Sequence, residues 1–370
     1  MTGQPYISVI VTAYNRRKYL PFALRSLEAQ TLPRDRFEVI VVKNFEDRES
    51  DDIISRNGWK DVYNDDPYHG RKILVGLEES KGDVITFLED DDMYTNNRLE
   101  EIYKAFTSYG HLMYFHNSQT IIDENGNVLE RPLFSKNLVG GSPLVIDINK
   151  LQKLAKRYEV DAVDLLLRFR ACFNSSSQSV RRSALETNAH LLKELPIGVD
   201  DFICASSLRA GGLMYFTDKR LTLYRVHGEN WSSDTDIAKS KSNDMYLRRA
   251  KTLLYIIKAH KLIGSRLLND SVNRYLSCER LGRGALLLLP LPELGVLPPE
   301  LRLSLSDIKL ALRCYKVEAT DLVNVASIMG LAFLSPLLAT PRGRIIIGKL
   351  AEGVIKALAT KRALRRARLS

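Results

Sequence analysis

Four acidic residues in a row, Glu-Asp-Asp-Asp at 89–92, directly follow a short apolar run at 84–88. The run is partly β-branched, which predicts a buried strand. Carboxylates that folding holds together repel one another, and a divalent cation relieves this repulsion; carboxylate oxygens suit Mg²⁺ or Mn²⁺. The alternative is an acidic loop before a helix that starts near Asn96, because acids are common at helix starts. Ligands of open α/β sheets bind beyond the carboxyl ends of strands, so the position favours the metal site.

Four other residues each have a chemical and a structural interpretation. Tyr14 follows a predicted strand, and its ring either stacks on a nucleobase or packs beneath a loop. Arg71 and Lys72 open the helix before the acidic strand. Cations at a helix N-terminus favour phosphate binding, although a solvated basic pair is the simpler alternative. His227 also follows a strand, and a lone histidine there carries no chemistry by itself.

The elements that position these residues follow from the apolar patterns. Strands are predicted at 7–11, 37–42, 61–63 and 84–88, and helices at 19–30, 50–57 and 73–80. This alternation predicts a parallel, doubly wound sheet. Beyond it we expect a strand within 112–122, a helix at 151–169 and strands at 213–216 and 220–226. Asp200 and Asp201 begin another helix that runs to about Arg209. The simpler interpretation of these two carboxylates is that they cap this helix.

The overall composition is that of a globular protein. The 370 residues are 45% hydrophobic and 26% charged, which suggests two domains or one domain with an appendage. Met1 to Tyr6 lack the features of a signal peptide. The cysteines, at 172, 204, 278 and 314, show neither metal-ligand spacing nor a disulfide framework, which predicts a reducing compartment.

The net charge of +10 is concentrated at the C-terminus. Residues 341–370 carry nine Lys or Arg and one acid, a net charge of +8, which leaves +2 for the rest of the chain. The part with the candidate chemistry is therefore nearly neutral. This distribution argues against a nucleic-acid-binding protein, although such proteins are often basic.

Four sequence segments together resemble the family 2 glycosyltransferases with the GT-A fold. The segments are ISVIVTAYNR at 7–16, GDVITFLEDDD at 82–92 followed by Arg98-Leu99, Asp200-Asp201, and YRVHGENWS at 224–232. They occur in the order that the family has, and the resemblance covers roughly residues 5–235. It implies an α/β fold with a mainly parallel, Rossmann-like sheet. Beyond the resemblance, the residue pattern at 237–289 predicts a largely helical C-terminal region.

The resemblance also implies a donor site for a nucleoside-diphosphate sugar. Asp91 would bind Mg²⁺ or Mn²⁺, and His227 would complete the metal or phosphate site. The cation would neutralise the charge that develops on the leaving diphosphate. Other residues would contact the nucleotide sugar, with Tyr14 stacking on the base: Thr12, Tyr14, Asn15, Asn44, Arg71, Lys72, Glu89 and Asp90.

On the acceptor side, Asp201 would be the general base, with Asp200 beside it. An alcohol is a poor nucleophile, so a positioned carboxylate must take its proton. One base opposite the leaving group gives a single displacement with inversion, the outcome that the family resemblance also implies. A sugar-nucleotide-binding domain without catalysis is the alternative function, but the presence of both acidic motifs favours the enzyme.

Two departures from the family pattern concern the nucleotide. The family often has Asp-Asp-Gly-Ser after its second strand, whereas this chain has KNFED at 43–47. Asn44 thus replaces the acid that reads the base edge; an amide both donates and accepts hydrogen bonds, so either a UDP- or a GDP-sugar is expected. The family's usual Arg-Asn pair in the helix before the acidic strand is also absent, and Arg71 and Lys72 are its expected substitutes.

The C-terminal part is expected to bind membranes. We divide the chain into a catalytic domain at 1–235, a helical extension at 236–320 and a membrane-associating segment at 321–370. Residues 322–341 carry no charge, which is near the length of about 20 residues that a spanning helix needs. A buried helical hairpin is the alternative. The basic amphipathic pattern that follows favours an anionic membrane at the cytoplasmic face, with a lipid-linked or membrane-presented acceptor.

Overall fold

The computed structural model describes residues 6–129, 143–157, 172–228, 230, 252, 255, 256, 259 and 262–268. The first of two compact units covers residues 1–233 and 266–268 and contains all the strands of the described chain. None of the described helices is long and apolar enough to cross a bilayer. The uncharged run at 322–341 and the basic tail lie outside the described residues, so the membrane prediction is untested.

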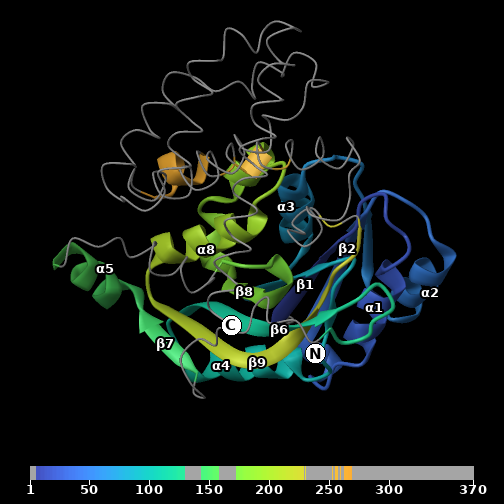
Figure 1. Ribbon diagram of the computed structural model, residues 1–370, viewed down its shortest axis with the longest axis horizontal. Helices are drawn as coiled ribbons and strands as arrows, with labels where there is room; N and C mark the ends of the chain where they lie inside the picture. Colours follow the sequence, from blue (N-terminus) through green and yellow to red (C-terminus); the bar gives the residue numbers. More distant parts are fainter. Residues whose placement is uncertain are drawn as a thin grey trace, which may run out of the picture. The chain divides into compact units, whose positions relative to one another are not determined.

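Alternating strands and helices build the first half of this unit (Figure 1). The strands are β1 (Ile7–Thr12), β2 (Phe37–Lys43), β3 (Lys60–Tyr63), β4 (Val84–Glu89) and β5 (Met93–Tyr94). The helices are α1 (Leu20–Glu28), η1 (Arg34–Arg36), α2 (Arg48–Arg56), α3 (His69–Glu79) and α4 (Arg98–Ser108). The predicted elements are all present, although α3 begins at His69 rather than near Arg71. Arg71 and Lys72 therefore lie inside the first turns of α3.

The second half is more irregular. Its strands are β6 (Leu112–Ile122), β7 (Leu144–Asp147), β8 (Gln178–Arg181) and β9 (Leu213–Arg225). Its helices are α5 (Ile148–Arg157), η3 (Ser175–Ser177), α7 (Arg182–Glu186), η4 (Ala189–Glu194) and α8 (Val199–Ala210). The two strands predicted at 213–216 and 220–226 form one strand, β9, whose pairing with β6 shifts register at irregularities. The predicted helix at 151–169 is described only to Arg157, as α5.

All nine strands form one sheet in the order β3-β2-β1-β4-β8-β6-β9-β5, with β7 also paired to β9. The neighbours β1, β2, β3 and β4 are parallel, as predicted. The short strand β8 then enters antiparallel to both β4 and β6, which makes the complete sheet mixed rather than doubly wound throughout. The parallel half is the part whose strand ends meet at one edge.

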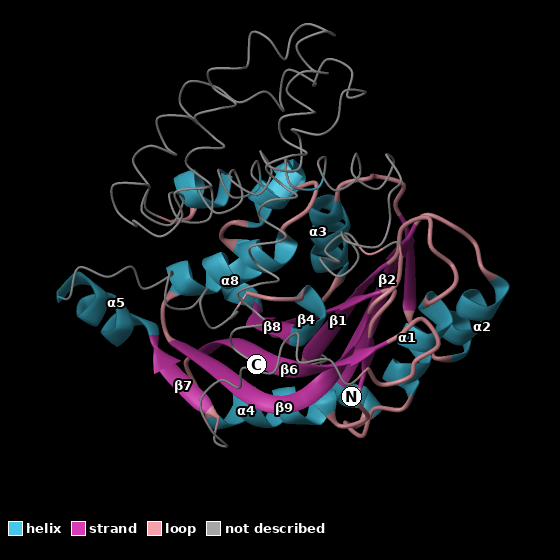
Figure 2. Cartoon of the chain, viewed as in Figure 1, coloured by secondary structure: helices cyan, strands magenta, loops and turns pink. Residues whose placement is uncertain are grey.

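Helices cover the sheet on two sides (Figure 2). Ile7, Val9 and Val11 of β1 face the core shared with α1, α2 and α4, and all three are fully buried. The intervening Ile10 faces α3, where a Cβ added at Gly76 would lie 2.4 Å from Ile10 Cγ2. This alternation is the period-two pattern of a strand buried on both faces.

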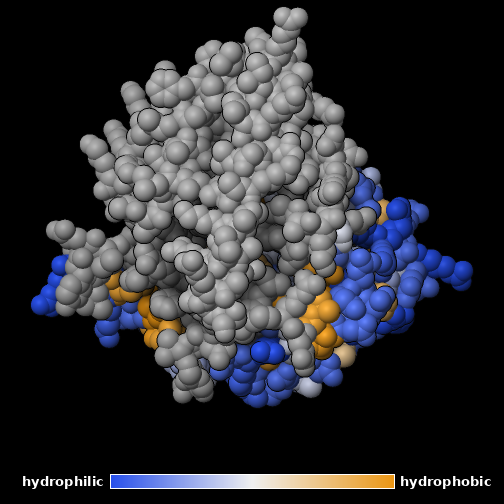
Figure 3. All heavy atoms as spheres, in the orientation of Figure 1, coloured by the Kyte–Doolittle hydropathy of each residue, from blue (hydrophilic) through white to orange (hydrophobic). Residues whose placement is uncertain are grey.

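The described surface on the face in Figure 3 is largely hydrophilic, with scattered hydrophobic patches. Among the described residues, the exposed large hydrophobic side chains are Phe22, Tyr63 and Val128. They belong to three separate elements or turns of the chain. Single exposed apolar residues are normal in soluble proteins and indicate no interface by themselves.

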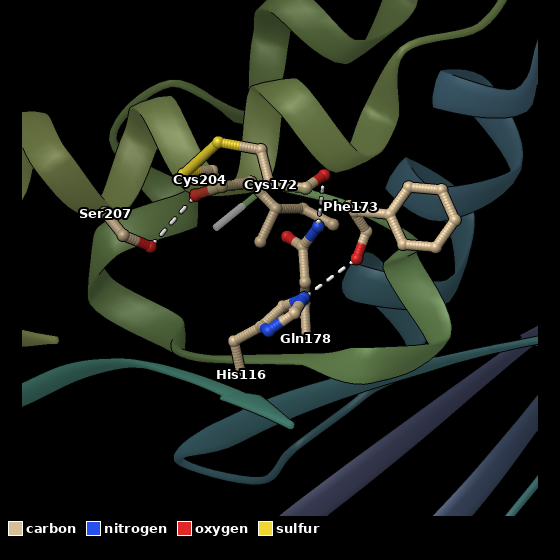
Figure 4. Close-up of a disulfide and its surroundings, with 7 residues drawn as sticks. His116, Cys172, Phe173, Gln178, Cys204 and Ser207 are labelled. Atoms are coloured by element: carbon tan, nitrogen blue, oxygen red, sulfur yellow. Dashed lines mark hydrogen bonds between the residues drawn. A yellow bond between two sulfur atoms is a disulfide. The ribbon is translucent and has the colours of Figure 1, made fainter. Parts of the chain in front are cut away.

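A disulfide joins Cys172 to Cys204 of α8 (Figure 4), which corrects the expectation that these cysteines are unpaired. Their Cα atoms are 5.4 Å apart although 32 residues separate them in the sequence. No spacing rule could predict the pair, because the packing of α8 against β8 and η3 brings the two residues together. Gln178 Nε2 and His116 Nε2 donate to the carbonyls of Cys172 and Phe173 at 3.0 and 2.8 Å. Cys278 and Cys314 lie outside the described residues.

Candidate functional site

The acidic segment begins where β1 and β4 end side by side. Parallel pairing places Thr12 opposite Glu89, and the backbone N–H of Asp90 donates to Thr12 O at 3.2 Å. The loop after β1 and the acids after β4 are therefore neighbours at the carboxyl edge of the sheet. Thr12 Oγ1 lies 3.3 Å from Nε2 of His69, the first residue of α3.

Arg16 reaches from the loop after β1 to two of the acids. Its Nη1 lies 2.9 Å from Asp91 Oδ2, while Nε and Nη2 both contact the Asp90 carboxylate. Asp90 and Asp91 are 2% and 7% exposed. Burial acts to raise the pKa of Asp91, but the hydrogen bond from His227 and the charge of Arg16 hold it below its usual range. Arg16 lies within the motif at 7–16, but no role was predicted for it.

His227 meets the same carboxylate from the segment after β9. Its Nε2 lies 3.0 Å from Asp91 Oδ2 and 3.3 Å from Arg16 Nη1, and the residue is buried. Arg225 supports this arrangement, because its Nε donates to Asp91 O at 2.9 Å and its backbone N–H to Asp92 Oδ1 at 3.1 Å. His227 and Arg225 therefore contact Asp91, although each lies more than 130 positions after it in the sequence.

The outer acids, Glu89 and Asp92, are held by the segment that contains η3. Ser175 Oγ donates to the Glu89 carboxylate, and Asn174 Nδ2 donates to Asp92 Oδ2 at 3.1 Å. Burial, together with the charges of Asp91 and Glu89, raises the pKa of Asp92 well above its usual range. Only a polar stretch of sequence marks these contacts, so Asn174 and Ser175 were not predicted.

Five of the eight predicted nucleotide-binding residues form two contact pairs and one outlier. Lys72 Nζ lies 4.3 Å from the centroid of the Tyr14 ring, and burial lowers the pKa of Lys72 to about 8. Asn15 and Asn44 exchange two hydrogen bonds of 2.8 Å, one from the Asn15 backbone and one from the Asn44 amide. Arg71 instead pairs with Asp66 and donates to Lys193 O, and none of its described contacts is with the acids after β4.

Asp200 and Asp201 lie in the first turn of α8. Asp201 is buried, and Asp200 is partly buried. The N-cap of α8 is Gly198, so neither carboxylate is the N-cap residue. Burial raises the pKa of Tyr114 well above its usual range, and the charges of both carboxylates add to this shift. The disulfide at Cys204 ties α8 to the chain two residues before Asn174, and thus to the segment that holds Glu89 and Asp92.

A divalent cation fits the donor atoms of Asp91 and His227. In an octahedral site with bonds of about 2.1 Å, two adjacent ligands are about 3.0 Å apart, and Asp91 Oδ2 and His227 Nε2 are separated by 3.0 Å. Among the described residues, no group of three or more His, Cys, Asp or Glu side chains is placed to hold a metal. Mg²⁺ sites commonly use one or two protein ligands together with substrate phosphates. The pair would therefore hold a cation only together with a phosphorylated ligand.

Comparison with known proteins agrees with this geometry. Residues 8–141 match Glycosyl transferase family 2. An uncharacterized glycosyltransferase of Haemophilus influenzae is 31% identical over 144 residues, which are 37% of this chain and 56% of that protein. One from Rickettsia bellii is 31% identical over 130 residues, 34% of this chain and 18% of that protein. Residues 8–141 are a family 2 glycosyltransferase domain. The match spans about half of the length of the Haemophilus relative and less than a fifth of the length of the Rickettsia relative.

The fold of this chain also has a solved counterpart. The crystal structure of S. aureus TarS residues 1–349 in complex with UDP-GlcNAc matches with a TM-score of 0.51 and 18% identity, over 95% of this chain and 92% of that chain. This likeness confirms the predicted GT-A fold class. The mixed sheet with helices on both faces is the architecture that the two proteins share.

Proposed function

We propose that this chain is a metal-dependent, inverting glycosyltransferase that moves a sugar from a nucleoside-diphosphate sugar to an acceptor hydroxyl. One observation carries the proposal: Arg16, Asp90, Asp91 and His227, from three distant segments, meet at the carboxyl edge of the sheet within a family 2 domain. A donor of this class is supported by the UDP-GlcNAc bound to TarS. The same edge is where α/β sheets bind ligands.

On the donor side, Asp91 and His227 would hold Mg²⁺ or Mn²⁺, which when bound neutralises charge on the leaving diphosphate. The Tyr14 ring would stack on the nucleobase, with Lys72 beside it near the phosphates. Asn44 would read the base edge, which a UDP- or a GDP-sugar could supply. Glu89 and Asp90 would contact the ribose and the phosphates.

On the acceptor side, Asp201 would accept the proton of the attacking hydroxyl, and Asp200 would support it. The oxygen attacks the anomeric carbon as the bond to the diphosphate breaks, so the configuration inverts in one displacement. The position of α8 supports this assignment, because η3 packs against both α8 and β4. The η3 segment therefore bridges the proposed acceptor and donor residues.

Separate measurements of nucleotide binding and of sugar transfer distinguish the donor-side role of Asp91 from the acceptor-side role of Asp201. Asp91→Ala is expected to abolish transfer and the Mn²⁺-dependent part of nucleotide binding, measured by calorimetry with UDP and GDP. Asp201→Asn is expected to keep nucleotide binding within about twofold but to lose transfer. The exposed Asp52 of α2 offers a control of equal charge, and Asp52→Asn should behave as wild type. Full transfer in excess EDTA, or an active Asp201→Asn together with an inactive Asp200→Asn, would contradict these assignments.

The acceptor is proposed to be lipid-linked or otherwise presented at an anionic membrane on the cytoplasmic face. The support is the uncharged run at 322–341 beside the nine cations of the tail. Each cation near an anionic surface contributes about 1 kcal/mol. A chain truncated before Asp321 should leave anionic vesicles in a flotation assay while the full chain stays bound. Equal flotation of both at low salt would refute the membrane proposal without affecting the donor chemistry.

A further inference from the structure

Arg16 contacts the two atoms that are proposed to bind the cation. Its Nη1 lies 2.9 Å from Asp91 Oδ2 and 3.3 Å from His227 Nε2, and those two atoms are 3.0 Å apart. The guanidinium is therefore in contact with both proposed metal ligands at once. A monovalent cation of the chain itself fills the electrostatic role that the divalent ion would have.

Arg16 and a divalent ion cannot both make these contacts without cost. An arginine has only donors, so the Arg16 N–H group at Asp91 Oδ2 takes up a lone pair that a metal ion would need. Two cations on the same two atoms also repel each other strongly in a buried site. The acids without any cation are equally unfavourable, because Asp90, Asp91 and Asp92 are all buried. A buried, ionised Asp91 therefore favours the presence of one cation or the other.

The position of Arg16 in the chain suits a side chain that moves. It belongs to the loop between β1 and α1, not to a helix or strand, and its side chain is 17% exposed. The preceding Asn15 has a φ of 56° and is fixed through its two hydrogen bonds with Asn44. The backbone is thus held while the long side chain can leave the acids. A guanidinium fork fits phosphate as well as carboxylate.

We propose that Arg16 is a displaceable counter-cation: it neutralises Asp90 and Asp91 before the donor binds, and it leaves Asp91 when a divalent ion arrives with the donor diphosphate. This inference rests on the proposed function, because it takes Asp91 and His227 as the metal ligands. Its consequence is an order of binding. The free enzyme excludes the ion, and the nucleoside diphosphate admits it by offering both phosphate ligands for the metal and a new partner for Arg16.

Binding of Mn²⁺ without turnover tests the proposal. The free Mn²⁺ signal in electron paramagnetic resonance gives its affinity for the full chain, alone and with UDP or GDP. Arg16→Met is expected to bind Mn²⁺ alone at least about tenfold more tightly than wild type, and to gain less from the nucleotide. Arg16→Gln should do the same, which guards against a folding defect in one variant. Arg17→Met is the matched control, because Arg17 is exposed on the same loop and its Nε donates to Glu46 O.

The outcomes separate this proposal from the proposed function. If Mn²⁺ binds wild type with nucleotide, but both Arg16 variants bind Mn²⁺ alone no more tightly than wild type does, Arg16 is not a counter-cation and the glycosyltransferase proposal stands. A gain that Arg17→Met reproduces would also overturn it, because net charge alone would then explain the effect. If the tighter binding in Arg16→Met survives Asp91→Asn, the ion is held elsewhere and both assignments fail.

Discussion

Loss of the Cys172–Cys204 disulfide should destabilise the packing of α8 on the sheet by a calculable amount. The bond closes a loop between residues 32 positions apart. Opening a loop of this length returns conformational entropy to the unfolded chain worth about 3 to 4 kcal/mol at 25 °C. Cys204→Ala is the cleanest perturbation, because Cys204 is fully buried and serine would add a buried hydroxyl.

Local hydrogen exchange is the appropriate assay because the chain has two compact units, and a global unfolding curve would mix them. Mass spectrometry of oxidised protein should show that amides of β8 and α8 lose protection equivalent to about 3 to 4 kcal/mol in Cys204→Ala. Amides of β2, on the far side of β1, should change much less. Cys172→Ala should give the same loss, and the double variant should add only about 1 kcal/mol of lost packing, because either change opens the same loop.

Two results would refute this reasoning. One is a thiol titration of denatured protein, purified without reductant, that finds both Cys172 and Cys204 free. The other is additive losses in the two single variants, since additive effects indicate two independent packing sites rather than one shared bond. Reduced wild type should match the single variants in protection of α8, which provides an internal check.

Two further predictions concern α3. Gly76→Ala should lower stability by roughly 1 to 3 kcal/mol in thermal or denaturant unfolding, because its Cβ would lie 2.4 Å from Ile10 Cγ2, whereas Gly110→Ala, with nothing within 4 Å, should be nearly neutral. Burial lowers the pKa of Lys72 to about 8 from 10.5, so between these pH values the unfolded chain keeps a proton that the folded chain has released. The stability of wild type relative to Lys72→Met should therefore rise from pH 8 to 10.5; a difference that is flat or falls with pH would contradict the shift.

The parallel half of the sheet was predictable because its signals are local. β1 and β4 are apolar runs, and each ends in polar residues that mark the carboxyl edge. The antiparallel β8 was not predictable, because its four residues are Gln-Ser-Val-Arg and lie inside a polar stretch. Gln178 and Ser179 are fully buried there, where hydrogen bonds replace apolar burial. A pattern of hydrophobicity carries no information about such a strand.

The candidate site also contains residues with a local sequence signal and residues without one. The acids at 89–92, the carboxylates of α8 and His227 stand out by residue type. Arg16 and Asn174 do not, because one of two adjacent arginines in a loop, or one polar residue in a polar stretch, cannot be singled out until its neighbours are known. Lys72 and Arg71 show the reverse: adjacent in the sequence, they diverge, since Lys72 lies by Tyr14 and Arg71 by Asp66.

The register of β1 against β4 connects the fold to the candidate site, and the packing of the core determines this register. Val9 and Val11 are buried in the core beneath α1, and Ile10 is buried against α3. A slip of one residue would exchange these faces and bring Ser8 into the core shared with α1. In the observed register Ser8 Oγ accepts from Gly82 N at 2.8 Å and donates to Glu38 at 2.7 Å. The packing of β1 therefore fixes Thr12 opposite Glu89, and this is what brings Arg16, four residues later, within reach of Asp90 and Asp91.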